Sequence, residues 1–196
     1  MKETRSLPAE LFAGRTLIFQ LAKNDFKKKY AGSYLGIVWA FVQPVVTVMV
    51  YWFVFGMIRS SSPRPVPFVL WLIAGLIPWF FFQDGLINGT NALLEYNYLV
   101  KKVVFGIDIL PMVKVVSAVF VHLFFILVAL ILYTAMGCYP TVYTIQVIYY
   151  TFCIFVLVLG ITYMTSSVVV FFRDLTQVIN IALQVGVWMT PIMWSM

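Results

Sequence analysis

Long uncharged stretches alternate along this chain with three short charged patches. Eighteen of its 20 charged side chains fall within residues 2–29, within residues 84–114, or at Arg173 and Asp174. Long parts of the sequence between them, residues 31–58 and 115–172, contain no charged residue. A transmembrane helix needs about 20 predominantly apolar residues, whereas a soluble domain carries charge on all of its surface elements. The pattern therefore predicts an all-α integral membrane protein.

Five transmembrane helices are predicted from the lengths of the apolar stretches. Turn-forming sequences separate some of them, including the polar run RSSSPRP and the tetrapeptide GCYP. The five predicted helices together form one membrane domain over residues 31–196. The five helices are expected at about residues 33–58, 67–91, 115–134, 143–170 and 175–195.

Residues 1–30 form a separate charged segment that is predicted to lie at the membrane surface. On a helix over residues 10–30, the apolar side chains fall within an arc of about 120°. Such an amphipathic helix lies in the bilayer interface and directs basic side chains to the headgroups. Packing of the same face on a partner is the alternative. The expected interfacial anchors are Lys23, Lys27, Lys28 and Lys29.

Composition and charge support the membrane interpretation and give an orientation. The chain is 63% hydrophobic and 10% charged, with a mean hydropathy of +0.98 and a net charge of +6. If the N-terminus is cytoplasmic, 11 of the 13 Lys and Arg residues face the cytoplasm, and Arg59 and Arg64 lie outside. The positive-inside rule therefore predicts a cytoplasmic N-terminus in the plasma membrane.

Few residues of this sequence are candidates for catalysis, metal binding or proton transfer. The sequence contains no phosphate-binding G-x-x-x-x-G-K-[ST] loop and no paired Cys or His at metal-binding spacing, so no cofactor, metal or catalytic site is expected in this chain. His122 and Asp84 are ionisable groups in predicted spans, which makes each a functional candidate. A structural hydrogen bond to a neighbouring helix would explain His122 equally well. Ion-coupled transport is disfavoured, because it needs several such groups at mid-membrane depth.

Aromatic residues make up 18% of the chain, more than two interfacial belts require. Most are explained by such belts. Some could instead line a path on which sugar rings slide. The candidates for this path are Tyr51, Trp52, Trp79, Tyr133, Tyr139 and Trp188.

The charged patch at residues 84–114 lies between the second and third predicted spans. It combines carboxylates and lysines with apolar residues, and it could dock a soluble partner. An ordinary cytoplasmic loop is the alternative.

Several segments, in order along the chain, resemble ABC-2 type permeases of the branch that exports bacterial surface polysaccharides. The similarity covers nearly the whole sequence. The matching segments are DFKKKYAGSYLGIVW (residues 25–39) followed by Gln43 and Pro44, AGLIPW (74–79), EYNYLVKKVVF (95–105) with ILP (109–111), VFFRD (170–174) and TPI (190–192).

The resemblance implies a homodimer that pairs with two copies of a separate ABC ATPase, which binds ATP and Mg²⁺. It also implies six spans per subunit, and the sixth is not contained in a sequence that ends at Met196. In this family the loop after the second span contacts the ATPase. The resemblance assigns Glu95, Asn97, Leu99, Val100, Lys101, Lys102 and Phe105 to that coupling segment.

The leading hypothesis is a permease subunit of an ATP-driven exporter, which moves a lipid-linked polysaccharide or teichoic acid, such as O-antigen, outward across the bacterial plasma membrane. This chain itself would not be an enzyme. One alternative is an ABC-2 permease for drugs or small molecules. The other is a membrane transferase acting on lipid-linked sugars, for which Asp84 and Glu95 are the candidate acid–base pair.

Overall fold

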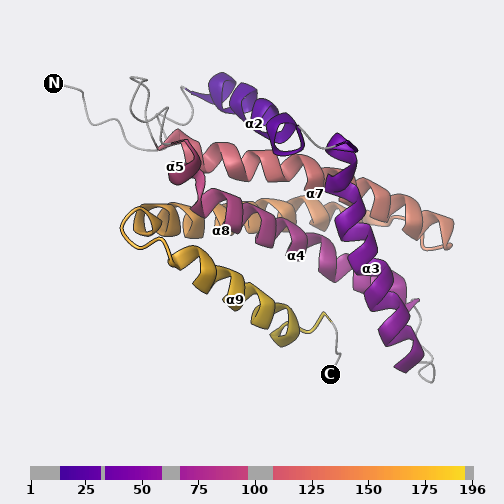
Figure 1. The fold of residues 1–196 in the computed structure, drawn as a ribbon. Coiled ribbons are helices and arrows are strands. Elements are labelled where there is room, and N and C mark those ends of the chain that lie inside the picture. The colour runs from indigo at the N-terminus through magenta and orange to yellow at the C-terminus, as the bar shows by residue number, and fades with distance from the viewer. Residues whose placement is uncertain (1–13, 32–33, 59–66, 97–107, 193–196) are drawn as a thin grey trace.

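A computed structural model describes residues 14–31, 34–58, 67–96 and 108–192, and in these residues it contains helices and no strand. The long helices run through a bundle, and α2 lies along one side of α7 (Figure 1). This confirms the predicted all-α fold. The elements are α2 (Arg15–Lys29), η1 (Gly36–Val38), α3 (Trp39–Ile58), α4 (Phe68–Thr90), α5 (Ala92–Glu95), α7 (Ile109–Ala135), η2 (Val142–Ile145), α8 (Gln146–Val169) and α9 (Leu175–Met189).

Four helical segments in the described part of the chain are long and apolar enough to cross a membrane. They cover Gly36–Phe55, Phe68–Thr90, Ile109–Ala135 and Val142–Val169. The protein is therefore an integral membrane protein. α9 is apolar but has 15 residues, which rise about 22 Å as a helix and fall short of a core of about 30 Å. The fifth crossing stays a prediction.

α7 begins at Ile109, ahead of the span that charge alone predicts from about residue 115. The difference arises at Lys114, which the sequence pattern assigns to a polar loop. In the structure this lysine is buried within α7 and paired with carboxylates. A paired charge does not have to end a helix.

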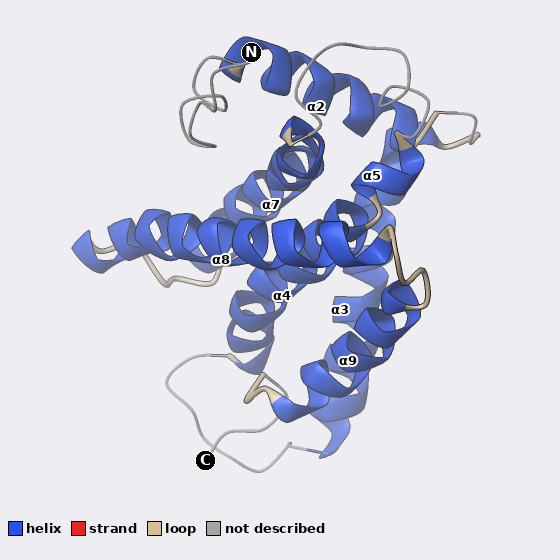
Figure 2. Cartoon of the chain, turned by 90° about the vertical axis from the view of Figure 1, so that its left-hand side faces the viewer, coloured by secondary structure: helices blue, strands red, loops and turns tan. Residues whose placement is uncertain are grey.

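α4 is the central helix of the bundle. It packs against α3, α7, α8 and α9, and Figure 2 shows it among these helices. α3 contacts few other elements, and much of its surface is exposed: Val46, Met49 and Phe53 are each half-exposed or more. The bundle thus has a packed core around α4 and a loosely attached α3.

Two glycines allow α4 and α8 to approach closely. A Cβ atom on Gly89 would lie 2.2 Å from Cγ2 of Thr162, and one on Gly85 would lie 2.9 Å from Cγ1 of Val158. The glycines are four residues apart and so share a face of α4, which is the small-xxx-small pattern of close helix pairs in membranes. Next to Gly89, the hydroxyl of Thr90 is hydrogen-bonded to that of Thr165 in α8 at 2.7 Å. The pattern was readable in the sequence, but its partner helix was not.

Gly89→Ala is expected to destabilise the bundle, because the added methyl group overlaps Thr162 and forces α4 and α8 apart. Overpacking of this kind typically costs about 1–3 kcal/mol. Thermal unfolding of the purified protein in detergent should show a lower midpoint. Gly160→Ala is the matched control, since a Cβ there meets no atom within 4 Å. Equal midpoints for the two variants would contradict the close contact.

Candidate functional site

Four side chains form a polar cluster where α2, α5 and α7 meet, which we call the charge cluster: Asp25, Glu95, Tyr96 and Lys114. Nζ of Lys114 lies 2.8 Å from Oδ1 of Asp25 and also pairs with Oε2 of Glu95. The Tyr96 hydroxyl donates to the same Asp25 oxygen at 2.7 Å. The side chains of Asp25 and Lys114 are each 8% exposed, whereas that of Glu95 is 49% exposed. The cluster therefore has a buried ion pair at its centre and a solvent-facing carboxylate at its edge.

The apolar face of α2 brings Asp25 to this position. Ile18 and Ala22 are buried against Ile109 and Val113 of α7. Asp25 follows on the same helical face, since residues three or four apart are neighbours on a helix. Burying a carboxylate among apolar residues is costly unless it is paired, and Lys114 supplies the pairing charge. The apolar face of α2 is thus covered by another helix of the same chain.

The proposed anchors lie on the rest of the α2 surface. Lys23, Lys27 and Lys28 are exposed, as expected for side chains that contact headgroups. Lys29 instead reaches α4, where its Nζ lies 2.5 Å from Oδ1 of Asp84. The interfacial role of these lysines stays a prediction, and Lys29 has acquired a defined partner.

Asp84 is held from two sides. Besides the pair with Lys29, its Oδ1 and its backbone carbonyl accept hydrogen bonds from the Asn88 amide at 2.9 and 2.7 Å. Tyr30 feels the charges of this pair. Burial raises the pKa of its phenol, Asp84 raises it further, and the positive charge of Lys29 lowers it. Asp84 and Glu95 each bind a different lysine, and among the described residues no hydrogen bond joins the two carboxylates. This arrangement does not favour an acid–base pair.

The charge cluster lies at one end of the predicted coupling segment. Of the assigned residues, Glu95 belongs to the cluster, while Asn97, Leu99, Val100, Lys101, Lys102 and Phe105 lie outside the described residues. At the other end, the backbone carbonyl of Asp108 accepts a hydrogen bond of 2.7 Å from the Tyr163 hydroxyl of α8. The described residues on either side of positions 97–107 are therefore bonded to the bundle, Glu95 and Tyr96 to α7 and α2, and Asp108 to α8.

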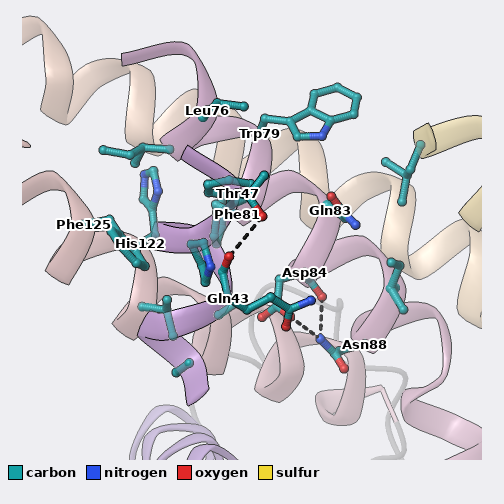
Figure 3. A pocket seen from close by; sticks show the side chains of 18 of the residues that line it. Gln43, Thr47, Leu76, Trp79, Phe81, Gln83, Asp84, Asn88, His122 and Phe125 are labelled. Carbon is teal, nitrogen blue, oxygen red and sulfur yellow. Dashed lines mark hydrogen bonds between the residues drawn. The ribbon is translucent and has the colours of Figure 1, made fainter. Parts of the chain in front are cut away.

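A cavity of about 440 Å³ lies among α3, α4, α7 and α9 (Figure 3). Asp84 and Asn88 are at one part of its wall, and His122 and Phe125 of α7 are at another. Besides Asp84 and several aromatic rings, four side-chain amides line it: Gln43, Gln83, Asn88 and Gln184. A concave site with apolar walls and a few polar groups is the usual form of a small-molecule or sugar site.

The predicted path aromatics divide between different places. Tyr51 and Trp79 line this cavity, and the Trp188 ring packs near Tyr51 with centroids 6.4 Å apart. Tyr133 and Tyr139 line a second cavity, whereas Trp52 lines neither of the two and is 54% exposed. The six residues therefore do not line one common cavity.

Sequence reasoning missed three members of the charge cluster: Asp25, Tyr96 and Lys114. Asp25 interrupts the apolar face of α2, and Lys114 is a lone charge followed by a long apolar run. Each was a signal of a buried charge. Their pairing could not be inferred, because 88 residues separate them.

A model of the ABC-2 type transporter family matches residues 16–196 of the chain. The chain belongs to the ABC-2 type transporter family. The match confirms the resemblance found in the sequence, and it makes the chain a membrane subunit of a transporter.

Two relatives of this ABC-2 transporter chain are named O-antigen export system permease protein RfbA. The one from Myxococcus xanthus is 27% identical over 97% of this chain and 72% of its own length. The one from Klebsiella pneumoniae is 27% identical over 91% of this chain and 69% of its own length.

Asp25→Asn is expected to destabilise the protein strongly, because it leaves the buried Lys114 charge without its buried counter-ion. Breaking a buried pair by removing one partner typically costs about 3–5 kcal/mol. Glu95→Gln removes the half-exposed carboxylate from the same lysine, and a pair in contact with solvent contributes about 0–1 kcal/mol. Thermal unfolding in detergent should rank the two variants in this order. A Glu95→Gln variant that loses as much stability as Asp25→Asn would contradict the assignment of Asp25 as the main partner.

Proposed function

We propose that this protein is the permease subunit of an ATP-driven exporter that moves a lipid-linked polysaccharide or teichoic acid outward across the bacterial plasma membrane. The family match and the relatives named O-antigen export permeases support this cargo class. The observation that carries the mechanism is that the described residues flanking positions 97–107 are bonded to three helices. A soluble partner that moves these flanking residues can pass its movement to the bundle.

The proposed orientation has the N-terminus in the cytoplasm. The distribution of Lys and Arg supports it through the positive-inside rule. In this orientation the charge cluster and α2 lie at the cytoplasmic side, and the exposed Lys23, Lys27 and Lys28 lie near anionic headgroups. The coupling segment then faces the compartment that contains ATP.

The proposed assembly is a homodimer of this subunit with two copies of an ABC ATPase. ATP and Mg²⁺ bind to the partner, and the partner's closure moves the segment at residues 97–107. Because Glu95 and Tyr96 bind Lys114 and Asp25, the movement reaches α7 and α2. Through Asp108 and Tyr163 it also reaches α8. The partner drives the change only if it binds one of the two arrangements more tightly than the other.

Replacing both Lys101 and Lys102 with Glu is expected to uncouple ATP hydrolysis from export, because the reversed charges repel the docking surface on the ATPase. Glycan export per ATP hydrolysed should fall by about tenfold or more, which corresponds to about 1.4 kcal/mol of coupling free energy. It can be measured with the permease and its ATPase in proteoliposomes that contain a lipid-linked glycan. The charge-preserving double variant, with Arg at both positions, is the control. Unchanged export by the Glu variant would refute the coupling assignment.

The first cavity is the proposed contact site for sugar units of the cargo. Aromatic rings stack on the apolar faces of sugars, and the four amides can bind hydroxyl groups without fixing one position. Trp79 is a central element of this wall, since it also packs against Phe82, with ring centroids 5.7 Å apart. The combination suits a cargo that slides through, rather than one that binds tightly.

Trp79→Leu is expected to lower export of the glycan severalfold per folded protein, because the cavity loses one of the two tryptophan rings that line it. Stacking on an aromatic ring contributes on the order of 1 kcal/mol. Trp52→Leu is the matched control, since Trp52 belongs to a predicted span but does not line the cavity. Export is measured in cells as surface glycan and normalised to the amount of folded permease. Equal losses for both variants would show that the cavity is not part of the sugar path. If the protein exports small drugs and no glycan, the proposed class of cargo is wrong.

A further inference from the structure

A second cavity, of about 1080 Å³, lies on another side of α4. Its walls are α4, the second half of α7, the turn at residues 136–141, and η2 with the first half of α8. The volume is slightly above the usual range for ligand sites, about 300–1,000 Å³. Its described lining residues include apolar side chains, hydroxyls and two thiols but no charged side chain. The cavity therefore suits a large, mostly apolar, uncharged occupant.

His122 contributes an unsatisfied polar group to this cavity. Its side chain is buried, with the residue 5% exposed, and it packs against the Phe81 ring at 4.7 Å between centroids. Neither ring nitrogen has a hydrogen-bond partner among the described residues, although the Ile77 carbonyl lies near the ring. A buried polar group without a partner costs roughly 1–3 kcal/mol, so each such group calls for an explanation. A ligand in the cavity that bonds the imidazole would supply one.

The two ends of the cavity lie at different positions along α7. His122 lies near the middle of α7, whereas Tyr133, Tyr139 and Tyr143 lie at or beyond its end. From His122 to Tyr133 the helix rises about 16 Å at 1.5 Å per residue. This is about half of a hydrocarbon core of roughly 30 Å. The cavity thus extends from mid-membrane depth to an interface that is marked by tyrosines, as expected for aromatic belts.

We propose that this cavity is a binding site for an uncharged, lipid-soluble molecule that presents a hydroxyl or carbonyl oxygen to His122. A neutral imidazole has one donor nitrogen and one acceptor nitrogen, and a hydroxyl can bond to either. A charged head group is disfavoured, because none of the described lining side chains can neutralise it in this low-dielectric region. The occupant's chain fills the apolar walls of α7 and α8.

The site is separate from the proposed sugar path. Ile77 and His122 are the two described residues that line both cavities, and they form the wall between them. The first cavity contains amides and Asp84, whereas the second contains no such group among its described lining residues. The lipid site therefore goes beyond the proposed export function and does not depend on it.

Three photoreactive probes with the same 16-carbon diazirine chain test the proposal: an alcohol, a hydrocarbon and a carboxylic acid. The full chain is reconstituted in lipid nanodiscs, irradiated with each probe, and digested to map the labelled peptides. The alcohol is expected to label cavity-lining residues of α7 and α8 severalfold more than the hydrocarbon and the acid. His122→Leu should abolish the preference for the alcohol, and His122→Gln should preserve it, because an amide retains both a donor and an acceptor.

Two tryptophan variants on α7 show whether the labelling reports the cavity. Leu130 lines it, and Leu130→Trp should reduce labelling of the cavity by the alcohol severalfold. Leu127 is 57% exposed and does not line it, so Leu127→Trp should leave the labelling unchanged. Equal labelling by alcohol and hydrocarbon, or a preference for the alcohol that survives in His122→Leu, would overturn the proposal. The latter result would mean that His122 does not bind the probe. Stronger labelling by the acid would refute the uncharged class.

Discussion

The buried ion pair between Asp25 and Lys114 holds together the part of this molecule that carries its proposed function. A charge in an apolar environment is costly, and each of these two residues is tolerated because the other is within 2.8 Å. The pair attaches α2, which is too polar to cross a membrane, to the first turns of α7, a candidate span. Asp25 also accepts the hydrogen bond of Tyr96, the last described residue before the proposed coupling segment. Loss of the pair would therefore affect a surface helix, a span and the coupling segment together.

The packing around α4 explains how a bundle with so few charged residues keeps a defined shape. In a bilayer the hydrophobic effect does not drive helices together, so close packing and hydrogen bonds between helices decide their arrangement. Gly85 and Gly89 allow α8 to approach α4, and Thr90 and Thr165 bond beside them. By contrast, α3 has few contacts with the other described elements of the subunit. This division agrees with a proposed dimer in which a second copy covers part of α3.

Individual residues show how far the sequence could be interpreted. Charge spacing was enough to place the long helices, because a bilayer requires long uncharged stretches. It misjudged the start of α7, since Lys114 was treated as a loop residue although it is buried. His122 could be identified as an ionisable group in a span. Only the arrangement of α4, α7 and α8 shows that it lies between an amide-lined cavity and an uncharged one.

The sequence by itself determined that this protein is an all-α membrane protein of the ABC-2 transporter family, because apolar length and family motifs are local properties of a chain. It also placed an amphipathic helix before the first span. The tertiary structure alone decided that α2 packs on α7, that Asp25 pairs with Lys114, and that the candidate aromatics fall into different cavities. These features depend on residues far apart in sequence. Lipid-facing and helix-facing surfaces are equally apolar here, so hydrophobic periodicity cannot tell which face meets which neighbour.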